Sequence, residues 1–158
     1  MEPKPLWILL TALVFFSGGW FGTEGCLEQE RIALLQLKSN FFSDPFSLLD
    51  WVDVKGSDCC RWERVECNIT SRRVIGLDLN FTRQGQGDVL YGYHNVDVPY
   101  GYLNVSLFLP FQELKSLTLS GNQIGDFVDN PVSLSAAFSK LEILGLRGDN
   151  FDGNIFSS

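Results

Sequence analysis

Histidine and methionine are nearly absent from this sequence, whose 158 residues contain one of each. The single histidine, His94, excludes mechanisms that need two and disfavours the Ser-His-Asp and Cys-His sites of hydrolases. Positive charge is also scarce, because 12 Lys and Arg stand against 19 Asp and Glu, a net charge of −7. A nucleic-acid-binding surface needs clustered Lys and Arg, so we expect no nucleic acid partner. With no nucleophile–base pair or carboxylate dyad in view, the sequence predicts no enzyme.

Long hydrophobic runs are missing as well. The longest spans residues 6–16, whereas a membrane-spanning helix needs about 18 apolar residues or more. Lys4 precedes this run and the small residues Ser17, Gly18 and Gly19 follow it. That order is typical of a secretory signal peptide, which we assign to residues 1–25. We therefore expect an exported chain with no membrane span. The alternative is an uncleaved anchor that extends through Phe21.

Export places four cysteines in an oxidising compartment, where cysteines pair; they are Cys26, Cys59, Cys60 and Cys67. Pairing Cys59 with Cys60 is disfavoured, because adjacent Cα atoms lie about 3.8 Å apart, below the usual disulfide range. Geometry leaves the other two connectivities open. Metal binding is the rival interpretation, but Cys-x-x-Cys spacing and nearby histidine are lacking. The sequence thus predicts two disulfides and neither a metal nor another cofactor.

Export also makes Asn-x-Ser/Thr sequences acceptors for N-linked glycans. Three such sequences begin at Asn68, Asn80 and Asn104. The pattern also arises by chance, so an unmodified asparagine is the alternative at each position. Three sites behind a signal peptide predict at least one glycan, and Asn68, directly after Cys67, is the best candidate.

Residues 26–67 form one compositional block bounded by cysteines, within a cap expected over residues 26–71. Helical spacing of apolar residues predicts a helix over Glu28–Asn40. Its apolar stripe is predicted to hold Ile32, Leu35 and Ser39, widened by Leu34, Leu37 and Phe41. Ser47 is predicted to cap a second short helix that ends near Trp51. Alternation over residues 62–67 predicts a short strand.

From residue 72 onward the chain becomes repetitive. One unit reads Leu114-x-x-Leu117-x-Leu119-x-x-Asn122-x-Ile124. The next begins 27 positions later (141 minus 114) and reads Leu141-x-x-Leu144-x-Leu146-x-x-Asp149-x-Phe151. An incomplete earlier copy reads Val74-x-x-Leu77-x-Leu79. This is the leucine-rich-repeat pattern, in which stacked coils bury one another's apolar edges.

Each part of the repeat has a physical role. Alternate leucines point inward from a short strand, because side chains on a strand alternate between its faces. The asparagine enters the following turn and satisfies backbone groups of its own coil and the neighbouring one. Asp149 stands at that position in the last unit, where it lacks the two amide donors.

We expect coils near residues 114–137 and 141–158, after an irregular first coil with an insertion over residues 82–102. The insertion is rich in Gly and Tyr. It is interpreted either as a loop without a role or as an aromatic contact surface.

The block resembles the N-terminal cap of plant leucine-rich-repeat proteins. The resemblance rests on CLEQERIALLQLK from Cys26, LDW from Leu49, DCCRW-x-x-V-x-C from Asp58 and RVIGLDL from Arg73. The paired cysteines point to the plant receptor-like proteins. The resemblance implies an α/β repeat fold: a leucine-rich-repeat solenoid over residues 72–158, behind a disulfide-stapled helical cap over residues 26–71. It also implies the pairs Cys26–Cys59 and Cys60–Cys67, and it places Arg64 where the family usually has glycine.

In this family, strands line a concave face, which is the default binding surface. Outward positions between the inward leucines are its candidate contacts: Ser116, Thr118, Ser120, Ile143 and Arg147. The alternative is plain solvated strand surface, since two or three coils are narrower than a standard interface of about 800 Å² per partner.

The resemblance implies an extracellular ligand-recognition module of a plant receptor-like protein in defence or developmental signalling. Its partners would be a peptide or protein ligand and membrane receptor kinases. We expect a secreted, apoplastic chain, or a cell-surface location for a longer parent. Because the sequence stops at Ser158 within a repeat, a fragment or truncated product is expected. The alternative function is a secreted inhibitor of microbial cell-wall hydrolases.

Overall fold

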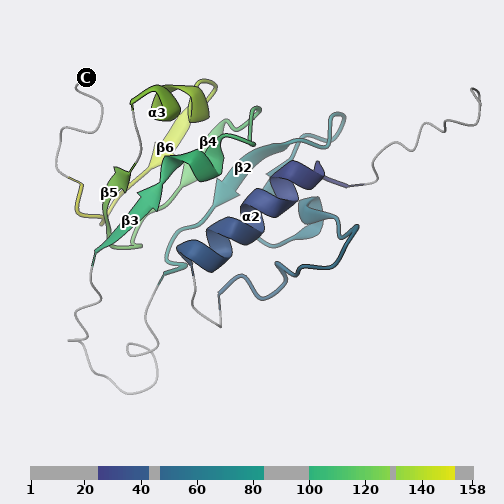
Figure 1. The fold of residues 1–158 in the computed structure, drawn as a ribbon, viewed down its shortest axis with the longest axis horizontal. Helices are drawn as coiled ribbons and strands as arrows, with labels where there is room; N and C mark the ends of the chain where they lie inside the picture. Colours follow the sequence, from purple (N-terminus) through teal and green to yellow (C-terminus); the bar gives the residue numbers. More distant parts are fainter. Residues whose placement is uncertain (1–24, 43–46, 84–99, 129–130, 152–158) are drawn as a thin grey trace, which may run out of the picture.

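The computed structural model describes residues 25–42, 47–83, 100–128 and 131–151. The predicted signal peptide, apart from Gly25, and His94 lie outside these residues. The fold begins with helix α2 (Glu28–Asn40), whose bounds confirm the predicted helix (Figure 1). Acidic residues lie in its first turn and Lys38 in its last, as the helix dipole favours.

The face that α2 turns to the core matches the predicted stripe only in part. Ala33, Leu34 and Leu37 are buried, whereas Ile32 is 43% exposed. Glu30 is fully buried on the inward side, because it is paired with groups outside the helix. The prediction was therefore confirmed for Leu34, Leu37 and Phe41 and wrong for Ile32 and Ser39, which are exposed. Apolar spacing alone does not reveal that an inward position of this helix holds a carboxylate.

The predicted second helix is also absent, and residues 47–50 form bends and a turn instead. Leu48 has a φ of +55°, which a right-handed helix cannot include. The Lys38 ammonium, from α2, donates to the carbonyls of Leu48 at 2.7 Å and Trp51 at 2.9 Å. These bonds fix the segment against α2, and a 3₁₀ turn, η1 (Cys59–Arg61), follows it.

Four strands form the main sheet, in the order β1-β2-β4-β6. Strand β1 (Val65–Cys67) lies within the predicted strand region and pairs antiparallel with β2 (Val74–Asp78). Strands β4 (Ser116–Thr118) and β6 (Ile143–Gly145) continue the sheet in parallel. Each of the three copies of the repeat pattern therefore contributes one parallel strand.

A second, two-stranded sheet was not predicted. Strand β3 (Gly101–Asn104) pairs in parallel with β5 (Ile124–Val128). The 3₁₀ turn η2 (Val105–Phe108) follows β3 in the chain, and helix α3 (Pro131–Ala137) follows β5. With α2, these elements lie across the core from the main sheet (Figure 1).

The insertion predicted over residues 82–102 is shorter at both ends than expected. Thr82 is buried, and Gly101 and Tyr102 belong to β3. The strand forms because Leu103 and Ile124 are both fully buried between the two sheets. Residues 84–99 lie outside the described part of the chain.

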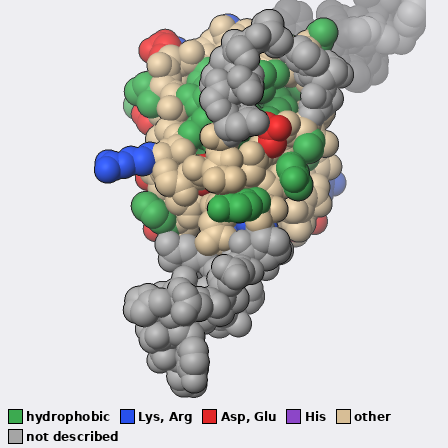
Figure 2. Space-filling model, turned by 90° about the vertical axis from the view of Figure 1, so that its left-hand side faces the viewer, with side chains coloured by type: hydrophobic (Ala, Val, Ile, Leu, Met, Phe, Trp, Pro, Cys, Tyr) green, Lys and Arg blue, Asp and Glu red, His purple; other side chains and the backbone are tan. Residues whose placement is uncertain are grey.

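The core confirms the inward positions of the repeats. Leu77, Leu79, Leu117 and Leu119 are at most 2% exposed. In the last described coil, Leu144 and Leu146 are partly buried against the same core. Figure 2 looks onto that end of the molecule and shows hydrophobic side chains in several separate groups. Three parallel strands are described, so a solenoid stays a prediction.

Asn122 ties the first two coils together as the repeat pattern predicts. Its Oδ1 accepts hydrogen bonds from the backbone N–H groups of Thr82 at 2.9 Å and Arg83 at 2.8 Å. Its Nδ2 donates to the carbonyls of Leu79 at 2.6 Å and Leu119 at 2.5 Å. The buried amide thus satisfies four backbone groups, one in its own coil and three in the preceding one.

Asp149 lies at the same position one coil later, but only one of its two carboxylate oxygens forms hydrogen bonds. Its Oδ1 accepts from the backbone N–H groups of Asn122 at 2.9 Å and Ile124 at 3.2 Å. Its Oδ2 is buried and has no hydrogen-bond partner within the described residues. Burial raises the pKa of the Asp149 carboxyl above its usual value, although the backbone hydrogen bonds oppose this.

Substituting Asp149→Asn should therefore stabilise the chain at pH 7 by about 1 kcal/mol, since an amide donates where the carboxylate cannot. A raised folded-state pKa means that Asp149 contributes stability fully below its unfolded pKa of about 3.9 and loses it as pH rises through the folded pKa. The gain in stability from Asp149→Asn should therefore increase as pH rises from about 3.9 through the folded-state pKa of Asp149. Urea unfolding at several pH values measures it, and a variant less stable than wild type at pH 7 would contradict the expectation.

Candidate functional site

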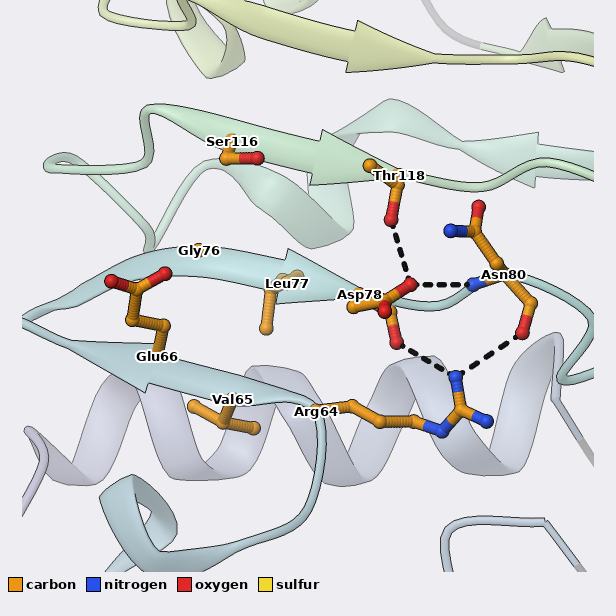
Figure 3. A pocket seen from close by; sticks show the side chains of 9 residues that line it. All are labelled: Arg64, Val65, Glu66, Gly76, Leu77, Asp78, Asn80, Ser116 and Thr118. Carbon is orange, nitrogen blue, oxygen red and sulfur yellow. Dashed lines mark hydrogen bonds between the residues drawn. The ribbon is translucent and has the colours of Figure 1, made fainter.

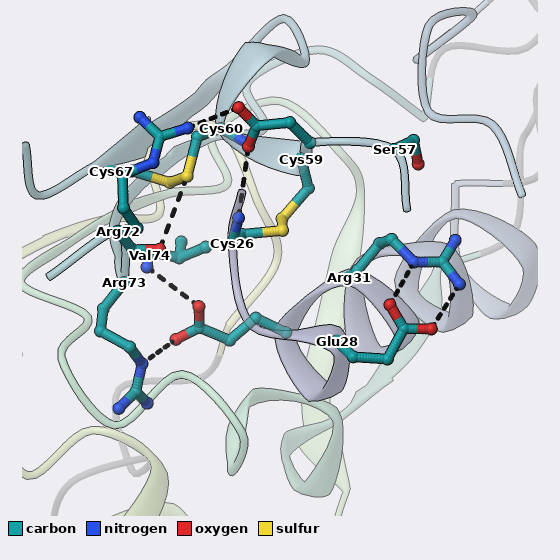
Figure 4. The surroundings of a disulfide bond; sticks show 12 residues. Cys26, Glu28, Arg31, Ser57, Cys59, Cys60, Cys67, Arg72, Arg73 and Val74 are labelled. Carbon is teal, nitrogen blue, oxygen red and sulfur yellow. Dashed lines mark hydrogen bonds and ion pairs between the residues drawn. A yellow bond between two sulfur atoms is a disulfide. The ribbon is translucent and has the colours of Figure 1, made fainter. Parts of the chain in front are cut away.

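Two disulfides close the N-terminal cap (Figure 4). They link Cys26 to Cys59 and Cys60 to Cys67, the pairing that the family resemblance implies. Asp58 lies between them, and its Oδ1 accepts from the backbone N–H groups of Cys26 at 3.2 Å and Cys60 at 3.0 Å. Within the described residues, no cluster of three or more His, Cys, Asp or Glu side chains could hold a metal ion. All four cysteines are bonded in the two disulfides, so they serve the structure of the cap.

A buried carboxylate joins the cap to the first repeat strand. Glu30, on α2, has a fully buried side chain and accepts from Arg73 Nε at 2.8 Å. Its other oxygen accepts from the backbone N–H of Val74, at the start of β2, at 3.2 Å. The sequence alone assigned no role to Glu30. A charged residue at an inward helical position was the one signal that could have identified it.

A second carboxylate of α2 forms a bidentate pair. Arg31 donates from Nε and Nη2 to the two carboxylate oxygens of Glu28, at 2.8 and 2.7 Å. Arg31 also donates from Nη1 to Asp53 at 3.0 Å. The hydrogen bond from Arg31 lowers the pKa of the Glu28 carboxyl. The Nε–Nη2 edge of an arginine in this protein thus holds a carboxylate through two parallel bonds.

The outer face of the main sheet consists of ordered rows of side chains. Register places Gly76, Ser116 and Ile143 side by side, and Asp78, Thr118 and Gly145 in the next row. The predicted contact residues all belong to this face: Ser116, Thr118 and Ser120 are half-buried, and Ile143 and Arg147 are exposed. Their part in binding stays a prediction.

Hydrogen bonds run across this face from coil to coil. Thr118 Oγ1 donates to Asp78 Oδ1 at 2.8 Å. The backbone N–H of Ser120 donates to Asn80 Oδ1 at 2.8 Å, and the N–H of Arg147 donates to Ser120 Oγ at 3.0 Å. These bonds hold the polar side chains in fixed positions, so the face is preorganised.

A hollow opens over β1, β2 and β4 on this face (Figure 3). Gly76 leaves the space, because a Cβ there would lie 2.9 Å from Oε2 of Glu66. At the other end, Arg64 Nη1 donates to the carbonyls of Asp78 at 3.1 Å and Asn80 at 3.2 Å. The lining comprises Arg64, Val65, Glu66, Gly76, Leu77, Asp78, Asn80, Ser116 and Thr118. Sequence reasoning did not assign Arg64 or Glu66 to it.

In each of the three predicted glycan acceptors, the side-chain oxygen Oδ1 accepts a backbone hydrogen bond. Asn68 and Asn104 are exposed, and each Oδ1 accepts from a backbone N–H two residues ahead, both at 2.8 Å. Asn80 is half-buried at the rim of the hollow and accepts from Ser120. The hydrogen bonds found in the described residues leave Nδ2, the atom that carries a glycan, unused in all three. Modification stays a prediction at each.

Within the described ranges, no helix has the length and apolar character needed to cross a membrane.

Comparisons with known proteins agree with this architecture. The family described as "Leucine rich repeat N-terminal domain" matches residues 27–68. Receptor-like protein 56 of Arabidopsis thaliana is 33% identical over 155 residues, covering 93% of this chain and 15% of that protein. Cuscuta receptor 1 of Solanum lycopersicum is 41% identical over 125 residues, covering 76% of this chain and 10% of that protein. This chain thus spans a small part of the length of these relatives.

A solved structure shares the fold. It is the leucine-rich-repeat ectodomain of the Arabidopsis receptor kinase HAESA, in complex with an N-terminally extended IDA peptide hormone. The TM-score is 0.52 at 21% identity, over 79% of this chain and 17% of that one. The two sequence relatives are named as a receptor-like protein and a receptor, and neither name indicates a catalytic function. The chain belongs to the plant leucine-rich-repeat receptor-like proteins, with a leucine-rich-repeat N-terminal domain over residues 27–68.

Proposed function

We propose that this chain supplies an extracellular ligand-recognition module, whose binding surface is the outer face of the main sheet. The observation that carries the proposal is the row of polar side chains on parallel strands, fixed from coil to coil by hydrogen bonds. Carboxylate, hydroxyl and guanidinium groups line its hollow and suit the polar groups of a peptide or protein ligand.

The relatives support the biological setting of this proposal. They are named as a receptor-like protein and a receptor and are much longer than this chain, so we place its face at one part of a longer recognition surface. Membrane receptor kinases are the proposed signalling partners, in defence or development. Two disulfides and three glycosylation sequences support a secreted or cell-surface location.

Selection from a displayed peptide library against the secreted chain tests the proposal. Peptides that bind the wild type should bind the Thr118→Arg variant at least tenfold more weakly, because Thr118 lies in the middle of the face. Ser135→Arg is the matched control, since Ser135 is exposed on α3, across the core from that face. Equal binding to both variants would contradict the proposal. Inhibition of a microbial cell-wall hydrolase by the chain would favour the alternative function instead.

Glycosylation gives a separate expectation. Protein secreted from a plant host should lose apparent mass on glycosidase treatment, and Asn68→Gln should remove part of that loss. The reason is that Asn68 is exposed in the turn between β1 and β2. Mass spectrometry that found all three asparagines unmodified would count against export.

A further inference from the structure

Two bulky residues next to the hollow have a left-handed backbone. Arg64, before β1, has a φ of +69°, and Phe81, after β2, has a φ of +54°. The next two coils hold glycine at the position of Phe81, two residues after the second inward leucine: Gly121 with a φ of +73° and Gly148 with +78°. A bulky residue in this region is a true outlier. The repeat geometry therefore requires glycine-like backbone at this position and no side chain.

Neither side chain is buried in the core, so core packing does not explain the left-handed backbone of either residue. Phe81 is 59% exposed and its ring lies on Gly121, where a Cβ would be 2.3 Å from the ring atom Cε1. Arg64 is exposed as well. Unfavourable backbone conformations that packing does not explain are concentrated at functional positions. Both residues are thus candidates for contact with a partner.

Only one of the three nitrogens of the Arg64 guanidinium forms hydrogen bonds within the described residues. Its Nη1 donates to the carbonyls of Asp78 and Asn80, whereas Nε and Nη2 have no partner within the described residues. Figure 3 shows the Nε–Nη2 edge turned away from β2. The same edge of Arg31 holds both oxygens of Glu28. Arg64 therefore presents the geometry that binds a carboxylate through two parallel bonds.

The acidic neighbours of Arg64 leave that edge available. Asp78 and Glu66 line the same hollow, but neither carboxylate forms an ion pair with Arg64 in the described residues. Oδ1 of Asp78 instead accepts from Thr118 Oγ1 and from the backbone N–H of Asn80. Among the described residues the charge of Arg64 has no ion-pair partner, so a carboxylate from a partner would complete it.

We propose that Arg64 and Phe81 are paired anchors for a peptide or protein segment that carries a carboxylate beside an apolar side chain. The carboxylate binds the Nε–Nη2 edge of Arg64, and the apolar side chain packs on the Phe81 ring. Asn80 connects the two anchors, because its carbonyl accepts from Arg64 and Phe81 follows it directly. Arginine and aromatic residues are the types enriched in interface cores. The inference rests on the proposed function of this face.

The peptides selected against the wild-type chain serve as the probe. We expect acidic residues next to apolar ones among them, and tenfold or weaker binding to Arg64→Lys, which keeps the charge but lacks the fork. Replacing the acidic residue of a peptide by its amide should weaken binding to the wild type and change little with Arg64→Lys. Phe81→Gly should also weaken binding tenfold, while its thermal unfolding midpoint stays unchanged or rises.

Each contrary outcome has a distinct meaning. Equal binding to Arg64→Lys and Phe81→Gly would overturn this inference, and loss on Thr118→Arg in the same experiment would leave the proposed function standing. A fall of more than about 5 °C in the midpoint of Phe81→Gly would show that the ring is structural, which overturns its role as an anchor. Failure of the wild type to select any peptide would overturn both the inference and the proposed function.

Discussion

Replacing Glu30 by alanine is expected to lower the free energy of unfolding by about 3–5 kcal/mol, the usual cost of removing one partner of a buried ion pair. The side chain of Glu30 is fully buried and bonded to both Arg73 and the backbone of Val74. Without it, the guanidinium of Arg73, whose side chain is 19% exposed, keeps its charge but loses its ionic partner. Urea unfolding of the secreted chain measures the change.

Glu113→Ala is the matched control for that substitution. Glu113 also pairs with a cation, Lys140, at 2.6 Å, but both side chains are well exposed, at 39% and 52%. An exposed pair contributes about 0–1 kcal/mol. Equal effects of the two substitutions would show that Glu30 does not join the cap to the first strand as described.

Removing the disulfides one at a time should produce a graded loss of stability. Replacing both Cys26 and Cys59 by alanine is expected to cost about 3.8 kcal/mol, and replacing Cys60 and Cys67 about 2.5 kcal/mol. The first pair closes a separation of 33 residues and the second a separation of 7, so the unfolded chain regains more freedom in the first case. Burial of Cys59 adds to the difference.

The same urea experiment checks this order. Non-reducing peptide mapping of the wild type provides the control, and it should yield the two pairs with no free thiol. Four thiols that react with an alkylating agent under native conditions would contradict both the pairing and export. A larger loss from the shorter loop would contradict the entropic account.

The repeat pattern predicted the parts of the fold that depend on local spacing. Alternate leucines such as Leu117 and Leu119 are buried because a strand turns every second side chain inward. Asn122 bonds to four backbone groups because its turn leaves them unsatisfied. The helix bounds Glu28–Asn40 also followed from the spacing of apolar residues, of which Leu34 and Leu37 are buried.

Features that depend on distant partners could not be predicted in this way. Glu30 faces the core because Arg73, 43 positions away, completes its charge. The small β3–β5 sheet forms from segments without a strand signal, held by the burial of Leu103 and Ile124. Arg64 was noted only as a replacement for glycine, and its left-handed backbone and its place at the hollow are set by the tertiary fold.

Site-specific photo-crosslinking tests most directly whether the outer face of the main sheet is the ligand-binding surface. A photoreactive benzoylphenylalanine would replace Ile143, 57% exposed on that face, or Val132, 76% exposed on α3. With a peptide selected against the wild type, we expect crosslinking from position 143 and none from position 132. Crosslinking from position 132 alone, or equally from both positions, would contradict the assignment of this face.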